Sequence, residues 1–415
     1  MDINRLLNPM ECSCGRTHRC DIQFVSIKKG AIGVLGEITT DYHTILLVAD
    51  ENTYQAAGEK TVAALPGKQL RKVIFSGKTV LIPDEKAIRQ VTDQLTGVDL
   101  IIGIGSGVIQ DLCKYVSHVN SIPYYIVATA PSMDGYASSG AAMILGGMKV
   151  TVSAAVPAAI IADTQVLKDA PMQMLQAGYG DIVGKYSCLN DWKLSALINQ
   201  EYFCQQVYDL TYAMADKVKA LANGILNRDE EAVGALMEAL VVVGIAMAYV
   251  GNSRPASGSE HHFSHYFEIT GILNNTPYLS HGIDVVYAAV LTAKLRRQMV
   301  QAKPARRDFD EAAWQKEISR IYGSSAQEVV ALQKKLGWYW QDNRDQVLPQ
   351  WEQIKAVLAE APPQEEMLAM VGALGLDYQE FVRLYGQEKI DDGVLYAKDL
   401  KDRYSVLWLY YEFFR

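Results

Sequence analysis

The sequence predicts an α/β protein with an N-terminal Rossmann-like dinucleotide-binding domain followed by an all-helical metal-binding domain. Short apolar runs typical of buried strands alternate with helical segments through the first 164 residues. Beyond that point the strand-like runs stop, and segments with helical periodicity continue nearly to the end of the chain. We therefore expect domains at residues 1–164 and 165–415, since a chain of 415 residues is too long for one ordinary core.

Five apolar runs are the expected strands of the first domain. They lie at residues 45–50, around 73–75, from 100 into a glycine-rich turn, at 124–128 and at 159–162. Pro83, Asp84 and Glu85 begin a helical pattern between the second and third runs, with the proline and acids that favour a first helical turn. Strands that alternate with helices in this way usually form a parallel sheet.

The glycine-rich turn is a candidate dinucleotide site. It reads GIGSGVIQDLCK from Gly103 to Lys114. Small residues allow a ligand to approach the backbone, and the amides that begin a helix can hold a pyrophosphate. The spacing differs from G-x-G-x-x-G, so the position of the turn between a buried strand and a helix carries the argument. Asp50, at the end of an earlier strand, could bind a ribose hydroxyl or could cap a helix.

A second candidate loop, TAPSMDGYASSG, spans residues 129–140. It is rich in hydroxyl groups and small residues and carries one carboxylate, Asp134. Such loops are often only turns, but at the carboxyl end of a parallel strand they lie where ligands bind.

Three of the seven histidines lie in SGSEHHFSH, residues 257–265. The preceding segment, NSRPASG, interrupts a long apolar helix, and a new helix can begin just after it. On that helix His261 and His265 share a face, whereas His262 points about 100° away.

Two further segments offer metal ligands. His281 precedes a later helix, and Asp181 lies between Gly180 and Gly184 in an apolar helical region. One carboxylate with two imidazoles and open positions would make a catalytic divalent-metal site. Alternatively, the histidines only cap or pack.

The six cysteines fall into two groups. Cys113, Cys188 and Cys204 are scattered through apolar sequence and are expected to be buried thiols. The N-terminal pattern C-x-C-G-x-x-x-H-x-C contains Cys12, Cys14, His18 and Cys20. This pattern could be a small zinc clip, although its spacing departs from C-x-x-C pairs, or a tail without metal. No signal peptide is expected, so neither are disulfides.

Composition narrows the location and the partners. The net charge of −8 argues against a nucleic-acid or anionic-membrane surface. The longest apolar run, Ala239–Gly251, is too short to span a bilayer and is typical of a buried core helix. We expect a cytoplasmic protein. The aromatic segment Tyr404–Phe414 should pack on the helical domain or on a partner subunit, and a homodimer is expected.

As a set, these segments resemble the iron-alcohol-dehydrogenase and dehydroquinate-synthase superfamily, and within it most closely the sn-glycerol-1-phosphate dehydrogenases. The similarity runs in order over roughly residues 25–300. It comprises VADENT, GIGSGVIQDLCK, TAPSMDGYASSGA, IIADTQVLKDAP, GYGDIVGK, SGSEHHFSH and SHG, with some further similarity at AKDLKDRYSVL. The N-terminal cysteines lie outside it.

The resemblance implies a metal-dependent interconversion of dihydroxyacetone phosphate and sn-glycerol 1-phosphate, a step in glycerophospholipid synthesis. The expected cofactors are NAD, with NADP possible, and one divalent metal ion per subunit, Zn, Ni or Fe. The implied metal ligands are Asp181, His261 and His281. Substrate contacts fall on Asp134, Asp181 and His265, and of these Asp134 and His265 are the expected catalytic residues.

His265 could relay the hydroxyl proton or hold a terminal oxygen. The expected cofactor-binding residues, from the resemblance and from the turn itself, are Asp50, Gly105, Ser106, Gly107, Val108, Ile109, Gln110, Asp111, Thr129, Ala130, Pro131, Ser132 and Ser138. The nearby cations Arg254, Lys149 and Lys185 are expected to be surface or structural residues rather than phosphate ligands.

Three alternatives stay open at this point. Glycerol dehydrogenases share the Asp-His-His set but need no phosphate site. Dehydroquinate-synthase-like cyclases share the architecture, but their pattern has Glu at the position of Asp181. It also has HGE where this chain reads HGID from His281. A catalytically silent nucleotide-binding protein is a third alternative, against which the intact Asp-His-His set argues.

Overall fold

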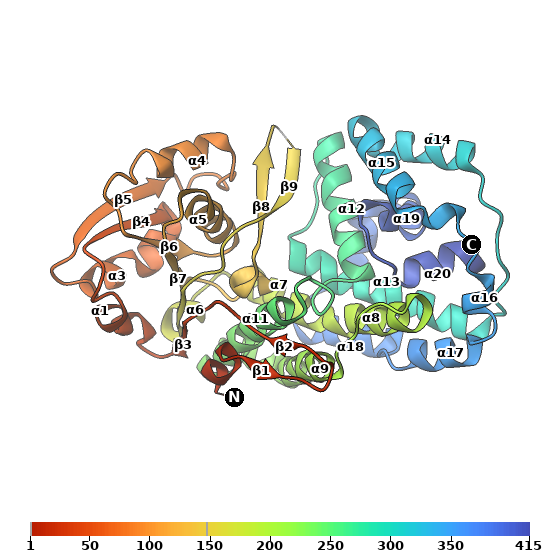
Figure 1. The fold of residues 1–415 in the computed structure, drawn as a ribbon, viewed down its shortest axis with the longest axis horizontal. Coiled ribbons are helices and arrows are strands. Elements are labelled where there is room, and N and C mark those ends of the chain that lie inside the picture. Colours follow the sequence, from red (N-terminus) through yellow and green to blue (C-terminus); the bar gives the residue numbers. More distant parts are fainter. Residues whose placement is uncertain (1, 147) are drawn as a thin grey trace. The chain divides into compact units, whose positions relative to one another are not determined.

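The computed structural model describes residues 2–146 and 148–415, with only the backbone of Met148 and Lys149. The chain folds as two compact units (Figure 1). The first comprises Met1–Tyr179 with Ala220–Gly251, and the second comprises Gly180–Lys219 with Asn252–Arg415. This division differs from the expected boundary at residue 164, because a long helix from the middle of the chain packs against elements of the first unit.

A parallel six-stranded sheet forms the centre of the first unit. Its order is β3-β10-β7-β6-β4-β5. The strands are β3 (Phe24–Lys28), β4 (Thr44–Asp50), β5 (Gln69–Phe75), β6 (Leu100–Gly105), β7 (Tyr124–Ala128) and β10 (Ala159–Asp163). Five of them match the expected runs. Strand β3 was not expected, because an edge strand needs only partial burial and FVSIK mixes polar with apolar residues.

The order of the strands places a switch point between β4 and β6. The chain leaves β4 for β5 on one side and returns to β6 on the other. Ligands of open α/β sheets bind at the carboxyl ends of such strands. Asp50 ends β4 and Gly105 ends β6, and Gly105 pairs with Ala128 at the end of β7. The predicted cofactor segments therefore begin at neighbouring positions of one sheet edge.

Two antiparallel hairpins complete the first unit, and neither was expected. The longer one pairs β8 (Gly140–Leu145) with β9 (Met148–Ser153). The N-terminal one pairs β1 (Met10–Glu11) with β2 (Thr17–His18). Strands of two residues are too short for any periodicity to indicate them.

Helix α11 (Glu230–Val250) is the core helix of the first unit. It is the one helix among the described residues that is long and apolar enough to cross a membrane, and 83% of its most apolar window is buried in the structure. The helix exceeds the expected apolar run, because it begins at a cap formed by Asp229. A Cβ atom added to Gly244 would lie 2.6 Å from Cβ of Ala137. Helix α11 therefore packs directly on the turn η4 (Asp134–Ala137).

The second unit is helical, and no strand follows Asp163 in the described part of the chain. Its main helices are α8 (Lys185–Asn199), α9 (Gln205–Ala220), α12 (Ser259–Asn274), α13 (His281–Gln301), α14 (Glu311–Tyr322), α15 (Ala326–Leu336), α17 (Trp351–Ala359), α18 (Gln364–Ala373), α19 (Tyr378–Tyr396) and α20 (Val406–Phe413). Helices α12 and α13 pack along each other. As expected, α12 begins directly after NSRPASG, which separates it from α11.

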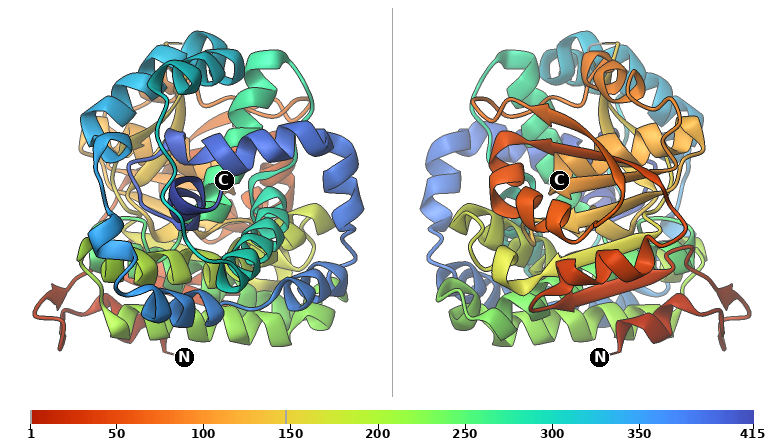
Figure 2. Two further views of the ribbon diagram at one scale, coloured as in Figure 1. Left: turned by 90° about the vertical axis from the view of Figure 1, so that its right-hand side faces the viewer. Right: turned by 90° about the vertical axis from the view of Figure 1, so that its left-hand side faces the viewer.

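The aromatic C-terminal segment is part of the core of this unit. Trp408 on α20 is fully buried, and its ring centroid lies 4.7 Å from that of Tyr339. The left view of Figure 2 shows the C-terminal end in the middle of the surrounding helices of this unit. Packing on the helical domain, one of the two expectations, is confirmed. The aromatic segment therefore supplies no argument for a subunit interface.

The turn after β6 makes a prediction about stability. A Cβ atom at Gly105 would lie 2.6 Å from Cβ of Ile109, whereas one at Gly107 would meet only Sδ of Met133 at 3.4 Å. We expect Gly105→Ala to lower the free energy of unfolding by about 1–3 kcal/mol through overpacking. The matched variant Gly107→Ala should change it by much less. Denaturant unfolding measures both, and equal effects of the two substitutions would contradict the close packing of the turn.

Candidate active site

Three of the predicted residues form one cluster in the second unit. Asp181 comes from α7 (Met172–Val183), His261 from the first turn of α12 and His281 from the first residue of α13. Oδ1 of Asp181 lies 3.4 Å from Nε2 of His261. One possible ligand atom of each residue lies within 4.8 Å of the others, and Asp181 and His261 are buried. The structure thus brings together all three predicted metal ligands.

Glycines allow the helices that carry these ligands to approach. A Cβ atom at Gly180 would lie 2.2 Å from the carbonyl oxygen of Gly282. One turn later, a Cβ atom at Gly184 would lie 2.4 Å from Cγ1 of Val285. No larger side chain fits at either position without a shift of the backbone or its neighbours. The GYGDIVG segment therefore does two things, supplying a carboxylate and bringing α7 against α13.

Neighbouring side chains orient the two imidazoles. Oε1 of Glu260 lies 2.7 Å from Nδ1 of His261, and since an ionised carboxylate only accepts, Nδ1 is the donor. The Ser264 hydroxyl lies 3.0 Å from Nδ1 of His281. Nδ1 of each ring thus has a partner outside the three predicted ligands, the usual arrangement in which outer partners orient metal-binding histidines. Sequence reasoning missed Glu260 and Ser264, although their spacing of four residues places them on one helical face.

The charges of the cluster suit a cation. Burial opposes ionisation of Asp181, but the Lys185 ammonium, 2.8 Å from Oδ1, and His261 hold the pKa of this carboxyl well below its usual range. Burial also disfavours charge on Glu260, but the hydrogen bond from His261 keeps the pKa of that carboxyl below its ordinary value. The ionised carboxylate of Asp181 and the imidazoles of His261 and His281 are a donor set that fits a divalent ion such as Zn²⁺, Ni²⁺ or Fe²⁺.

The other two histidines of the segment behave differently. The ring of His265 lies 5.5 Å from that of His281 and 6.5 Å from that of His261, and its side chain is 23% exposed. His262 is fully buried, and neither of its ring nitrogens has a hydrogen-bond partner in the described part of the chain. Burial and the nearby Arg403 lower the pKa of His262 well below the ordinary value. His265 therefore borders the cluster, and His262 is a neutral core residue.

A pocket in the first unit lies at the switch point of the sheet. Its volume is about 730 Å³, within the range of cofactor sites. Six of the predicted cofactor-binding residues line it: Asp50, Ser106, Val108, Ile109, Thr129 and Ala130. The structure therefore gathers residues from three strand ends around one cavity.

The polar residues of this pocket also have structural roles. The Asp50 carboxylate caps α2 (Glu51–Thr53) by accepting a hydrogen bond of 2.9 Å from the Thr53 amide. Asp50 therefore caps a helix, one of its two expected roles, and it also lines the pocket. Ser106 caps α5 (Gly107–Asn120) and lies 3.2 Å from the Ser132 hydroxyl. The Gln110 side chain faces the core instead, where it is buried and donates to the carbonyl oxygen of Tyr136.

A buried lysine that sequence reasoning did not single out holds the second loop. Nζ of Lys114 donates to the carbonyl oxygens of Gly135 (3.0 Å) and Gly140 (2.8 Å) and lies 3.4 Å from Oδ1 of Asp111. Burial lowers the pKa of Lys114, and Asp111 acts in the opposite direction. Lys114 thereby holds the loop that carries Asp134 and Ser138.

The nearby cations follow the expectation where their side chains are described. Arg254 is buried, and its Nε lies 2.7 Å from Oε1 of Glu201. Lys185 is buried against Asp181. Both are structural cations. The side chain of Lys149 lies outside the described part of the structure. Asp134 belongs to the first unit, whereas the metal cluster and His265 belong to the second.

Comparisons with known proteins agree with this fold. Residues 26–171 match the family model described as iron-containing alcohol dehydrogenase. The chain is 34% identical over 301 residues to a glycerol-1-phosphate dehydrogenase (NAD(P)+) of Halalkalibacterium halodurans, which covers 71% of this chain and 75% of the relative. It is 35% identical over 303 residues to the protein of the same name from Geobacillus thermodenitrificans, with 70% and 74% covered.

A solved structure extends the similarity in fold to most of the chain. Sulfoacetaldehyde reductase from Bifidobacterium kashiwanohense, determined in complex with NAD+, matches with a TM-score of 0.60 and 13% identity, over 93% of this chain and 92% of that chain. Family model and relatives together show an oxidoreductase of the iron-containing alcohol dehydrogenase class, and the solved structure shows that the fold is shared. Within that class, the chain belongs to the glycerol-1-phosphate dehydrogenase family.

The cluster makes a prediction about metal content. Asp181→Ala, His261→Ala and His281→Ala should each lower the bound metal by about one ion per chain, because three protein ligands leave no redundancy. His262→Leu, which replaces a neutral core residue with one of similar volume, should keep the ion. Elemental analysis after gel filtration measures the content. Full metal in His261→Ala together with loss in His262→Leu would contradict the assignment of the ligands.

Proposed function

We propose that this protein catalyses the NAD(P)H-dependent, metal-dependent interconversion of dihydroxyacetone phosphate and sn-glycerol 1-phosphate. The observation that carries the proposal is the Asp181, His261 and His281 cluster in a chain that is 34% identical to a glycerol-1-phosphate dehydrogenase over three quarters of that relative. The reaction would form the backbone of a glycerophospholipid. The alternative of a silent nucleotide-binding protein is disfavoured by this cluster of oriented donors.

Each residue of the cluster has a proposed part. Asp181, His261 and His281 would hold the divalent ion, with Glu260 and Ser264 orienting the two rings. When bound, the ion would polarise the oxygen atom that changes between ketone and hydroxyl. His265, partly exposed beside His281, would carry the hydroxyl proton between substrate and solvent, or would hold a terminal oxygen. Asp181 and His265 would contact the substrate from this unit.

The first unit would bind the nicotinamide cofactor. The cofactor would lie along the turn from Gly105 to Asp111, with amides of the first turn of α5 facing the pyrophosphate. Residues 129–132 and Ser138 would also contact the cofactor. Asp134, on a turn held by Lys114 and α11, is the residue of this unit that would contact the substrate. The functional division that we propose thus assigns the cofactor to residues 1–164 and the metal and substrate to residues 165–415.

The same proposal includes the location, the oligomeric state and the partners of the enzyme. We infer a cytoplasmic homodimer that acts on a small phosphorylated substrate and has no nucleic-acid partner, as its net charge of −8 favours. Sedimentation measures the oligomeric state.

The handedness of the product tests the proposal most sharply. A fixed oxygen, cofactor and phosphate would leave one face of the flat carbonyl open to hydride. NADH and dihydroxyacetone phosphate should therefore yield a glycerol phosphate that an sn-glycerol-3-phosphate dehydrogenase does not consume. Chelation should abolish NADH oxidation, and added divalent metal should restore it. Consumption of the product by the second enzyme, or oxidation of glycerol in preference to the phosphorylated substrate, would refute the proposal.

The carboxylate of Asp50 leads us to predict a preference for NADH over NADPH. A carboxylate there, followed by Glu51, should accept the adenosine ribose hydroxyl and repel a 2′-phosphate. NADH should have the higher kcat/KM, and Asp50→Asn, which keeps a capping oxygen for α2, should narrow the difference between the cofactors by roughly tenfold. The matched variant Asp84→Asn, at the cap of α4 (Glu85–Thr92), should leave the ratio unchanged. Equal efficiency of the unmodified enzyme with NADH and NADPH would count against this assignment.

A further inference from the structure

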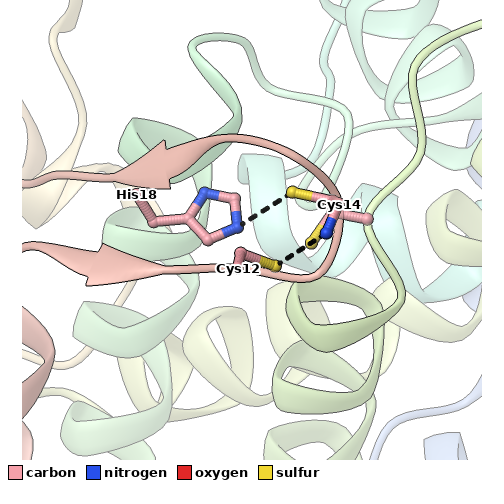
Figure 3. A group of neighbouring side chains, drawn as sticks. Cys12, Cys14 and His18 are labelled. Carbon is pink, nitrogen blue, oxygen red and sulfur yellow. Dashed lines mark hydrogen bonds between the residues drawn. The ribbon is translucent and has the colours of Figure 1, made fainter.

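The N-terminal hairpin brings two thiols and an imidazole together outside the proposed active site (Figure 3). Cys12 and Cys14 lie in the turn between β1 and β2, and His18 ends β2. Sγ of Cys14 lies 3.6 Å from Nε2 of His18, and the Cys14 amide donates to Sγ of Cys12 over 3.5 Å. One possible ligand atom of each residue lies within 4.8 Å of the others. The glycerol-1-phosphate chemistry makes no use of this cluster.

The contacts of the His18 ring orient its Nε2 atom toward Cys14. The side chain is fully buried, and its Nδ1 lies 3.1 Å from the carbonyl oxygen of Tyr249 on α11. A carbonyl oxygen only accepts, so Nδ1 carries the proton and donates. The ring also stacks on that of Tyr249, with centroids 5.1 Å apart and planes 19° apart. In a neutral imidazole, Nε2 is then the acceptor, and it faces Cys14 with its lone pair.

This arrangement is the one that outer partners give to a metal-binding histidine. Metal-bound imidazoles usually donate their other N–H group to a backbone carbonyl or a carboxylate. In a tetrahedral zinc site, with Zn–S of about 2.3 Å and Zn–N of about 2.0 Å, a sulfur and a nitrogen ligand lie roughly 3.6 Å apart. The separation of Cys14 Sγ and His18 Nε2 has this value. The amide that donates to Cys12 is of the kind that stabilises a thiolate.

We propose that Cys12, Cys14 and His18 bind a structural zinc ion. Two thiols lose their protons on binding, and the ion is neither oxidised nor reduced. Tetrahedral zinc leaves a fourth position for a water molecule or a further donor. Gly15, with φ of +83°, allows the tight turn in which its amide donates to the carbonyl oxygen of Cys12.

Cys20, the last member of the sequence pattern, is not part of the cluster within the described residues. Burial raises the pKa of its thiol, so it is a poor thiolate donor. It therefore serves as a matched control. The site would hold the hairpin on α11, where His18 already contacts Tyr249, and so help to pack the core helix of the first unit.

Thiolate-bound zinc can be measured separately from an ion held by Asp181 and two histidines. We would titrate the full-length holoenzyme with p-hydroxymercuribenzoate, which displaces zinc from thiolates, and follow release with a zinc indicator. The unmodified protein should release about one zinc ion per chain, in line with one two-thiolate site. Cys12→Ser, Cys14→Ser and His18→Ala should release none, and Cys20→Ser should release as much as the unmodified protein.

Cobalt substitution keeps the test valid if a variant folds poorly. Protein produced with Co²⁺ should show a near-ultraviolet thiolate-to-cobalt charge-transfer band in the unmodified and Cys20→Ser forms, and no such band in a Cys12→Ser, Cys14→Ser double variant whose circular dichroism is native. An unmodified protein that releases no zinc and shows no band would overturn the proposal. So would a Cys12–Cys14 disulfide found by mass spectrometry after alkylation, or loss of zinc in Cys20→Ser.

Discussion

The close crossing of α7 and α13 is the constraint on which the cluster of Asp181, His261 and His281 depends. The carbonyl oxygen of Gly282 occupies the space where Gly180 would carry a side chain, and Val285 does the same at Gly184. This approach brings the Asp181 carboxylate on one helix close to the His281 imidazole at the start of the other. Interiors are packed closely enough that one methyl group at such a contact must displace backbone. The close packing of α7 against α13 therefore requires glycine at positions 180 and 184.

Paired charges also stabilise the cluster around Asp181 and His261. Asp181 and Glu260 are carboxylates in a buried region, where an isolated charge is costly to hold. Lys185 contacts Asp181, and His261 lies between the two carboxylates. Each charge thus has a partner, and the bond that stabilises the Glu260 carboxylate also orients the His261 ring. Stability of the fold and orientation of the ligands come from one network.

The pocket of the first unit differs from this cluster, because backbone amides at strand ends would do most of the cofactor binding that we propose there. The switch point between β4 and β6 brings the ends of three strands to one pocket, and Gly105 permits the sharp passage from strand to helix. Lys114, fully buried, holds the neighbouring loop through the carbonyl oxygens of Gly135 and Gly140 and the Ser138 hydroxyl. A ligand at this edge would meet amides and hydroxyls whose positions are set by the sheet and by one internal cation.

The sequence alone determined the alternation of buried strands with helices, the change to helices after residue 164, and the positions of five of the six sheet strands, because these depend on local periodicity. It also placed His261 and His265 on one face and His262 on another, since that needs only the geometry of a single helix. The tertiary structure decided what depends on contacts between distant segments. It placed β3 at the sheet edge, assigned α11 to the first unit, and gave Glu260, Ser264, Lys185 and Lys114 their partners. It also separated Cys20 from Cys12, Cys14 and His18, because the spacing of residues along a chain does not fix which side chains meet once a turn has formed.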